Sequence, residues 1–309
     1  MDQEELISVV IPVYNSEQSL EELCERLEKV FEKENMQYEI ILVDDCSKDN
    51  SWKILKKLKN GNECIKIIRL MKNFGQHNAI LCGFNYVNGD YVVTIDDDLQ
   101  NPPEEIPKLL KKIKNGYDAV IGCQQRKNDK LYKKLGSRAI RYLNRKIFGK
   151  PKNLIISSFR IMKKEVTDEI KLLKSPFPYI TGMLLSLTNN IANETVKHDK
   201  RKYGTSTYSL SKLIRLSFNL MINYSSWPLK ALAVVGFSIS IFSFGYAMFV
   251  IVEKLTIGVN VPGWTSVIVL LSFFNGLILI MLALIGEYLG RIIIEVSNAP
   301  QFVIRKKIL

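Results

Sequence analysis

Two long stretches without charge near the end of the chain restrict its architecture more than any other feature. Residues 231–252 carry no charged side chain, and neither do residues 255–286, which contain an apolar run from about 267 to 285. Each stretch is long enough to cross a bilayer, which takes ~20 apolar residues as a helix. Two buried core helices are the alternative, but uncharged stretches of this length disfavour it. We therefore predict two transmembrane helices, at about 230–252 and 266–286.

Basic residues flank these two stretches and predict their orientation. The loop between them, residues 253–265, has one acid and one base, whereas the flanks carry Lys230, Arg291, Arg305, Lys306 and Lys307. Because positive residues favour the cytoplasmic side, the part of the chain before these stretches and both termini are predicted to be cytoplasmic. The first residues are acidic, so no signal peptide is expected. The sequence predicts a multi-pass protein of the cell's inner (plasma) membrane.

Before these stretches, apolar β-rich runs alternate with amphipathic segments. Strands are predicted at 6–13, 38–43, 64–70, 92–95 and 118–122, and helices at 20–34, 52–58, 78–85 and 103–115. This alternation is typical of a doubly wound, mostly parallel α/β sheet flanked by helices. Amphipathic segments are also predicted at 130–148 and 207–223.

The net charge of +12 is concentrated in one segment. Residues 126–152 contain eleven Lys or Arg side chains and one acid, Asp129. Lys134, Arg138, Arg141 and Arg145 share one face of the helix predicted there. Such a basic face binds nucleic acid, a membrane surface or a phosphorylated ligand, or it has no partner and is exposed to solvent. The apolar stretches favour the lipid bilayer as partner and disfavour nucleic acid.

The cysteines and histidines do not suggest a site. The five cysteines are odd in number and form no Cys-x-x-Cys pair, which argues against disulfides or zinc and fits a reducing compartment. His77 and His198 are far apart in the chain, so a structural role is expected for both.

Three carboxylates follow one predicted strand directly. Asp96, Asp97 and Asp98 end the apolar run, and Gln100 and two prolines come next. Asp96 and Asp98 alternate along an extended backbone, so both can face one hard cation, with Gln100 on the same side. An acidic turn or helix cap is the alternative. The pattern favours a divalent metal site at the carboxyl end of the strand, where α/β sheets bind ligands.

Polar residues also end the first two strands. Pro12, Tyr14 and Asn15 offer a bend and an aromatic face for a base, and Asp44 and Asp45 can accept hydrogen bonds from a base or ribose. Singly, Tyr14 could be a core aromatic residue and Asp45 a helix cap. No phosphate-binding G-x-x-x-x-G-K-[ST] loop or G-x-G-x-x-G fingerprint is present. The strand ends together favour a nucleotide site of another type.

Several motifs resemble one known family. They are Ile11-Pro-Val-Tyr-Asn15, Val43-Asp-Asp-Cys-Ser-Lys-Asp-Asn-Ser51, Asn73-Phe-Gly-Gln-His-Asn-Ala79, Asp96-Asp-Asp-Leu-Gln-Asn-Pro-Pro103, Phe159-Arg160 and His198-Asp-Lys-Arg-Lys-Tyr-Gly-Thr-Ser206. They are similar to motifs of the inverting GT-A glycosyltransferases of family 2. The similar branch makes polyprenyl-phosphate sugars: dolichol-phosphate mannose synthases, bactoprenol glucosyltransferases and undecaprenyl-phosphate 4-deoxy-4-formamido-arabinose transferases. The resemblance covers essentially the whole chain.

The resemblance implies a role for each matched residue. Mg²⁺ or Mn²⁺ would be held by Asp96, Asp98 and Gln100. The nucleotide would be bound by Pro12, Tyr14, Asn15, Asp44, Asp45, Asn73, Gly75 and Asp97. The catalytic set would be Asp96, Asp97, Asp98, Arg126, Arg160 and Arg201. The acceptor phosphate would lie near Lys134, Ser137, Arg138, Arg141, Lys202 and Ser206.

The implied reaction moves one sugar from a nucleotide sugar, with a UDP-sugar favoured, to undecaprenyl phosphate or another polyprenyl phosphate. Where many relatives carry Arg and Asp, this chain has Gln124-Gln125 and Ser157-Ser158, so the sequence names no protein base. A phosphate acceptor, with its second pKa near ~6, is already largely dianionic at neutral pH. Other hypotheses are a processive polysaccharide synthase, whose Gln-x-x-Arg-Trp motif is missing, and an inactive membrane scaffold.

The predicted organisation has four parts. Residues 1–206 form a cytoplasmic GT-A domain, residues 207–228 an interfacial amphipathic helix, residues 229–290 the two transmembrane helices, and residues 291–309 a basic cytoplasmic tail. The resemblance further implies a homo-oligomer, namely a tetramer.

Overall fold

The computed structural model describes residues 5–124, 145, 147–148, 150–151, 153–175, 177–199, 202, 225, 227–257, 263–297 and 300–309. The described residues form two compact units: Met1–Leu210 with Pro300–Leu309, and Ser211–Ala299. The segment predicted at 207–223 lies outside the described residues. So does most of the helix predicted at 130–148, of which residues 145, 147 and 148 are helical.

An eight-stranded sheet forms the centre of the first unit, in the order β7-β5-β6-β4-β1-β2-β3-β8. The strands are β1 Leu6–Val13, β2 Gln37–Asp44, β3 Ile65–Leu70, β4 Tyr91–Thr94, β5 Ala119–Cys123, β6 Arg160–Lys163, β7 Ile191–Thr195 and β8 Ile304–Ile308. β1 pairs in parallel with β2 and β4, β2 with β3, and β5 with β7. The predicted mostly parallel sheet is therefore confirmed, with antiparallel pairs at β6 and β8.

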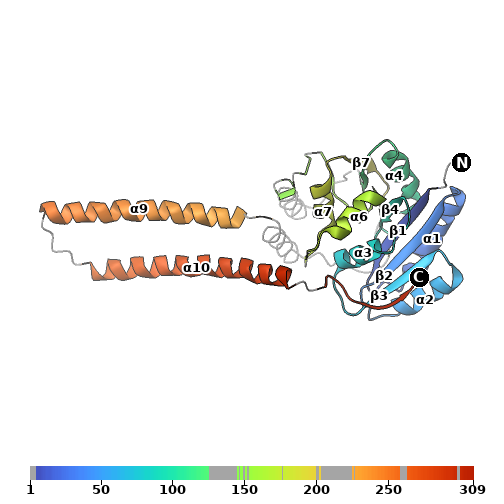
Figure 1. Cartoon of the computed structure of the whole chain (residues 1–309), viewed down its shortest axis with the longest axis horizontal. Coiled ribbons are helices and arrows are strands. Elements are labelled where there is room, and N and C mark those ends of the chain that lie inside the picture. The colour runs from blue at the N-terminus through green and yellow to red at the C-terminus, as the bar shows by residue number, and fades with distance from the viewer. Residues whose placement is uncertain are drawn as a thin grey trace. The chain divides into compact units, whose positions relative to one another are not determined.

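Helices cover both faces of this sheet (Figure 1). They are α1 Leu20–Lys33, α2 Ser51–Gly61, α3 Gln76–Phe84, α4 Ile106–Ile113, α6 Lys164–Leu172 and α7 Ile180–Leu187, with a short η1 at Pro103–Glu105. Successive residues of one strand point to opposite faces, so Val9 packs with α1, α2 and α4, whereas Val10 packs with α3, α6 and α7. Strands buried on both faces read as continuous apolar runs, which is why they could be predicted.

Residues 291–309, predicted as a basic tail, contain the end of a helix and the last strand of the sheet. Residues 291–296 continue a long helix, and β8 then pairs antiparallel with β3 at the edge of the sheet. The Met71 amide donates to the Val303 carbonyl at 2.8 Å, and the Gln301 side chain donates to the Ser175 carbonyl at 2.7 Å. Figure 1 shows the C-terminus beside β2 and β3. The end of the chain thus belongs to the same unit as its beginning.

The second unit contains two long helices, α9 Trp227–Ile257 and α10 Trp264–Val296. They lie side by side, joined at one end (Figure 1). Their described apolar side chains are largely exposed, for example Phe242 at 74% and Leu279 at 66%. By length and composition one segment of the described residues, Phe273–Val296, can cross a membrane, and Trp227–Ile239 is a shorter apolar segment.

Candidate active site

A cavity of about 640 Å³ lies where β1, β2 and β4 end. Nine of the residues predicted for the site line it: Pro12, Tyr14, Asp45, Asn73, Gly75, Asp96, Asp97, Asp98 and Gln100. The carboxyl ends of parallel strands meet at one edge of a sheet, which brings these residues together from distant parts of the chain. The structure thus brings nine of the predicted site residues together around one cavity.

The turn after each of these strands contains a residue with positive φ. Asn15 follows Tyr14 with φ of 54°, Cys46 follows Asp45 with 60°, and Leu99 follows Asp98 with 60°. Non-glycine residues adopt this left-handed region at an energetic cost, and such residues gather at functional sites. In all three turns, the residue with positive φ directly follows a residue that lines the cavity.

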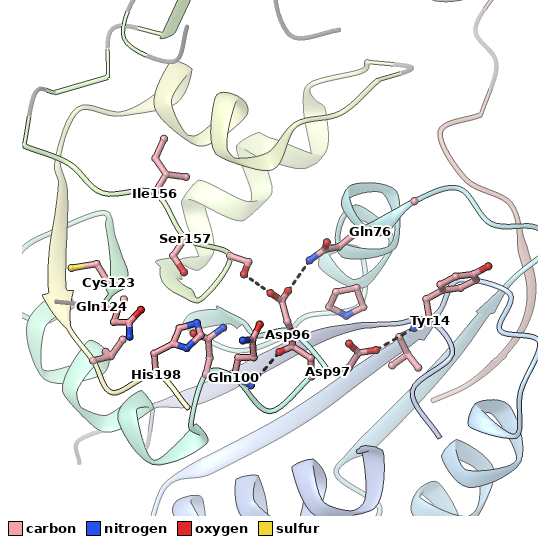
Figure 2. A pocket seen from close by; sticks show the side chains of 18 of the residues that line it. Tyr14, Gln76, Asp96, Asp97, Gln100, Cys123, Gln124, Ile156, Ser157 and His198 are labelled. Atoms are coloured by element: carbon pink, nitrogen blue, oxygen red, sulfur yellow. Dashed lines mark hydrogen bonds between the residues drawn. The ribbon is translucent and has the colours of Figure 1, made fainter. Parts of the chain in front are cut away.

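Asp97 connects the end of β4 to the turn after β1. Its Oδ2 accepts a hydrogen bond from the Tyr14 amide at 3.2 Å (Figure 2) and another from the Ser16 hydroxyl. Desolvation raises the pKa of Asp97 to about 7, and the neighbouring carboxylates of Asp96 and Asp98 act in the same direction. The structure therefore gives Asp97 a role in holding the turn that carries Tyr14, whose side chain is 44% exposed.

Asp45 holds the loop between β3 and α3. Its two carboxylate oxygens accept from the Phe74 amide at 2.7 Å and the Gly75 amide at 2.8 Å. Burial raises its pKa, although these two hydrogen bonds lower it. This loop supplies Asn73, Gly75 and Gln76 to the cavity wall.

Asp44 and Asn15 do not line the cavity. The fully buried Asp44 carboxylate lies 3.0 Å from Nε of Arg69 and accepts from the Ser47 amide at 2.8 Å. Asn15 Oδ1 accepts from the Lys48 amide at 2.8 Å, and the Asn15 amide donates to the Ser47 hydroxyl at 3.0 Å. Asn15 joins the turns after β1 and β2, and Asp44 joins the turn after β2 to Arg69 of β3, so both shape the site from behind its wall.

Asp96 lies between two different elements. Oδ1 accepts from Nε2 of Gln76 at 2.7 Å, and Oδ2 accepts from the Ser158 hydroxyl at 2.5 Å (Figure 2). Gln76 is the first residue of α3, and Ser158 lies in the segment just before β6. Asp96 therefore connects both elements to the end of β4.

The residues predicted to hold a metal suit an ion that is also bound by the phosphates of a substrate. Asp96, Asp98 and Gln100 all line the cavity, and Asp98 Oδ1 accepts from the Gln100 amide at 3.1 Å. Within the described part of the chain, no three His, Cys, Asp or Glu side chains are grouped to hold a metal by themselves. Mg²⁺ usually binds one or two carboxylates together with substrate phosphates. Two carboxylates and an amide oxygen suit this mode better than a permanently bound ion.

Arg160 lies outside the cavity wall. It is 2% exposed, its Nη1 donates to the Thr181 hydroxyl at 3.2 Å, and its Nε donates to the Ser158 carbonyl at 3.4 Å. Burial lowers its pKa to about 10. The ring of His77 packs edge-on against Tyr179 at 5.4 Å, and desolvation, with a smaller effect of Arg160, lowers the pKa of His77 to about 4. His77 thus has the predicted structural surroundings.

Lys202 contacts Glu22 of α1 at 2.7 Å and does not line the cavity. The other predicted residues lie outside the described residues: Arg126, Lys134, Ser137, Arg138, Arg141, Arg201 and Ser206.

Several cavity residues were not predicted. They are Val13, Gln76, Asn101, Gly122, Cys123, Gln124, Ile155, Ile156, Ser157, Ser158, Val196 and His198. Gln76 lies inside the quoted 73–79 motif and Ser157-Ser158 was noted as a departure, so a signal existed for both. His198, for which a structural role is predicted, lines the cavity, and in the same segment the Asp199 amide donates to the Gln100 carbonyl at 2.9 Å. Nothing in the sequence pattern indicates that contact.

Comparisons with known proteins agree on one family. A family model described as "Glycosyl transferase family 2" matches residues 8–171. The undecaprenyl-phosphate 4-deoxy-4-formamido-L-arabinose transferase of Proteus mirabilis is 37% identical over 97% of this chain and 93% of its own length. The protein of the same name from Yersinia enterocolitica is 36% identical, with the same two coverages.

Solved structures show the same fold. Glucosyl-3-phosphoglycerate synthase from Mycobacterium tuberculosis, in complex with Mn²⁺, uridine diphosphate and glucosyl-3-phosphoglycerate, matches with a TM-score of 0.53 at 18% identity. The match covers 71% of this chain and 78% of that chain.

Proposed function

This chain belongs to glycosyl transferase family 2, as its motifs predicted, and from this membership we propose that it transfers one sugar from a nucleotide sugar to a polyprenyl phosphate. The observation that carries the proposal is the cavity at the carboxyl edge of the sheet, where Asp45, Asp96 and Asp98 converge from two strand ends. The similar proteins whose names include undecaprenyl phosphate support this acceptor.

The donor is proposed to lie in this cavity. Tyr14 is half-exposed and available to a base, while Asp97 and Asp45 hold the two loops that surround that part of the wall. A UDP-sugar is favoured, which the uridine diphosphate complex of the structurally similar synthase supports by analogy.

A divalent ion, Mg²⁺ or Mn²⁺, is proposed to be held by Asp96, Asp98 and Gln100. When bound, it would stabilise the charge of the departing nucleoside diphosphate. The residues of the chain orient the donor and exclude water from it, with Asp97 and Asp45 fixing the walls. These ligands suit Mg²⁺ and Mn²⁺ alike, because both metals bind carboxylate and amide oxygens.

The acceptor needs orientation and charge compensation more than it needs a base. A phosphate monoester is largely dianionic at neutral pH, so its oxygen can attack the anomeric carbon directly. Ser157 and Ser158, at the place where many relatives carry an acid, present neutral hydroxyls at the cavity wall. The acceptor phosphate is proposed to lie near Lys134, Ser137, Arg138, Arg141, Lys202 and Ser206. Arg126 and Arg201 stay proposed members of the catalytic set, near the pyrophosphate or the acceptor. We place Arg160 behind the wall, acting through Ser158.

The chain is proposed to cross the membrane twice. β8 pairs with β3, so residues 300–309 must lie on the same side of the bilayer as the rest of the sheet. Any path between residues 199 and 300 therefore crosses the bilayer an even number of times. If α10 spans it, α9 is the available second span: its 31 residues reach about 46 Å, against ~30 Å of hydrocarbon.

This parity supports two crossings with both ends of the path on one side of the bilayer. The basic flanks of the apolar stretches support the cytoplasm as that side, at the inner membrane, and residues 207–228 stay proposed to lie at the membrane surface. The catalytic unit then comprises residues 1–206 together with 300–309. The homotetramer also stays a proposal.

The test is an assay of membranes that contain the chain. A panel of nucleotide sugars is supplied with undecaprenyl phosphate, with and without EDTA, and the lipid fraction is analysed by mass spectrometry. We expect one lipid-linked monosaccharide that disappears with EDTA. A polymer would instead indicate a processive synthase, and nucleotide-sugar hydrolysis without a lipid product would reject the acceptor.

A further inference from the structure

Asp96 has a hydrogen-bond donor on each of its two oxygens, and the two donors come from different elements. The distances are 2.7 Å from Gln76 Nε2 and 2.5 Å from Ser158 Oγ. A carboxylate has about four lone-pair sites on its two oxygens, so these two donors do not by themselves exhaust the positions at which it can accept a ligand. Two donors on separate oxygens also fix the rotation of the carboxylate about its Cβ–Cγ bond.

Ser158 is itself firmly held. Its carbonyl accepts from the Thr94 hydroxyl at 2.6 Å, and the neighbouring Arg160 pairs with Thr94 in the β4–β6 ladder. Arg160 adds a longer contact to the same carbonyl. The backbone of Ser158 is therefore attached to the end of β4, two residues before Asp96, and its hydroxyl is directed at the Asp96 side chain.

Gln76 is held from the other side. Gly75, with φ of +91°, lies directly before α3 and donates its amide to Asp45 at 2.8 Å. At the far end of α3, a Cβ on Gly83 would clash with Cγ1 of Val10, so the helix packs closely on β1. The first turn of α3 is thus fixed relative to the sheet, although the Gln76 side chain is exposed.

We propose that Ser158 and Gln76 are positioning residues that orient Asp96 toward the divalent ion of the glycosyl donor complex. The proposal rests on the proposed function, because it needs that ion. It assigns a role to Ser158, one of the two serines at the place where many relatives carry an acid. Both donors are neutral, so they orient the carboxylate without cancelling the charge that attracts the cation.

The test measures metal binding directly. Mn²⁺ is titrated into the purified full-length protein with uridine diphosphate present, and free Mn²⁺ is followed by electron paramagnetic resonance. Ser158→Ala should weaken Mn²⁺ binding by about ten-fold, the usual effect of removing a group that orients a metal ligand. Gln76→Leu should weaken it less, because water can replace an exposed donor. In the transfer assay, the Mn²⁺ concentration for half-maximal rate should rise while the rate at saturating Mn²⁺ stays closer to wild type.

Two controls separate positioning from a loss of structure. Ser158→Thr keeps the hydroxyl and should retain most of the Mn²⁺ affinity. Ser186→Ala removes a hydroxyl that bonds within α7, remote from Asp96, and should leave Mn²⁺ binding and melting temperature unchanged. Wild-type Mn²⁺ affinity in Ser158→Ala would overturn this inference alone. No Mn²⁺ binding by the wild-type protein would reject the proposed metal and this inference with it.

Discussion

Asp96, Asp97 and Asp98 are neighbours in the chain, yet their carboxylates have different partners. Asp97 accepts from the turn after β1, Asp96 accepts from α3 and from the segment before β6, and Asp98 accepts from the Gln100 amide. A run of three acids is thus divided between one that holds the wall and two that can face a cation. Residue type alone does not distinguish these tasks; the partners of each oxygen do.

The first prediction concerns Asp98. Asp98→Ala should reduce metal-dependent sugar transfer at least a hundred-fold, because one of two proposed carboxylate ligands is lost. Membrane insertion should be unchanged, since the residue is far from both apolar helices in the chain. The measurement is transfer rate against Mn²⁺ concentration, with extraction of the protein from membranes as the control. Full activity in this variant would remove the cation from the proposed mechanism.

Asp97 should behave differently, because its partners are the Tyr14 amide and the Ser16 hydroxyl. Asp97→Ala leaves two donors without an acceptor and should lower the free energy of unfolding by about 1–3 kcal/mol. Asp97→Asn keeps one oxygen and should cost less. Chemical denaturation of the three proteins at one pH measures this difference. Equal stability of the alanine variant and the wild type would mean that Asp97 does not hold the turn.

His77 predicts a dependence of stability on pH. Its pKa is about 4 in the folded chain, against 6.5 for a histidine exposed to water, so the unfolded chain binds the proton more readily. This contribution is fully present above about pH 6.5 and is lost as the pH falls toward 4, with a total on the order of 3 kcal/mol. His77→Phe should keep the ring contact with Tyr179 and flatten the stability profile in this range. An unchanged slope between pH 6.5 and 4 would assign the acid sensitivity to other groups.

At the scale of elements, β8 affects the site although it does not reach it. Met71 donates to Val303 and its carbonyl accepts from Arg305 at 3.3 Å, directly before the loop that Asp45 holds. Ile304 packs on the side of the sheet that α3 covers. The end of the chain therefore helps to position the loop that carries Asn73, Gly75 and Gln76.

This arrangement predicts that Ile304→Asp lowers stability by about 1–3 kcal/mol and raises the KM for the donor. The cause is a charge placed against the core and a weakened attachment of the 71–76 loop. Lys306→Gln, an exposed change in the same strand, is the matched control and should affect neither quantity. A donor KM equal to that of the wild type in a destabilised Ile304→Asp protein would limit β8 to a structural role.

The elements differ in how far sequence could predict them. β1 to β4 are largely buried and read as apolar runs, and the acidic residues at the ends of β2 and β4 predicted a site at that edge of the sheet. β8 reads Ile304-Arg-Lys-Lys-Ile308, which as a single sequence resembles a basic tail, because lysines are common on edge strands. Gln76 and Ser158 are 20 and 62 residues from Asp96, and pairing over such distances has no local signal.

At the scale of the whole molecule, the pairing of β8 with β3 predicts the topology of the membrane segment. Cysteines placed singly in the loop between α9 and α10, in a chain with Cys46 and Cys64 replaced, should react with impermeant thiol reagents from outside the cell. A cysteine introduced by Lys306→Cys should react only after the membrane has been permeabilised. Reaction of both from the same side would contradict two crossings.

The position of β8 also has a consequence for biosynthesis. The ribosome delivers β1 to β7 before the two apolar helices and β8 after them, so the described sheet cannot be complete until residues 304–308 have been synthesised. Until then the outer edge of β3 has no neighbour. A chain whose residues 304–308 do not return to β3 after membrane insertion leaves this edge open, and an open strand edge is a template for pairing with other chains.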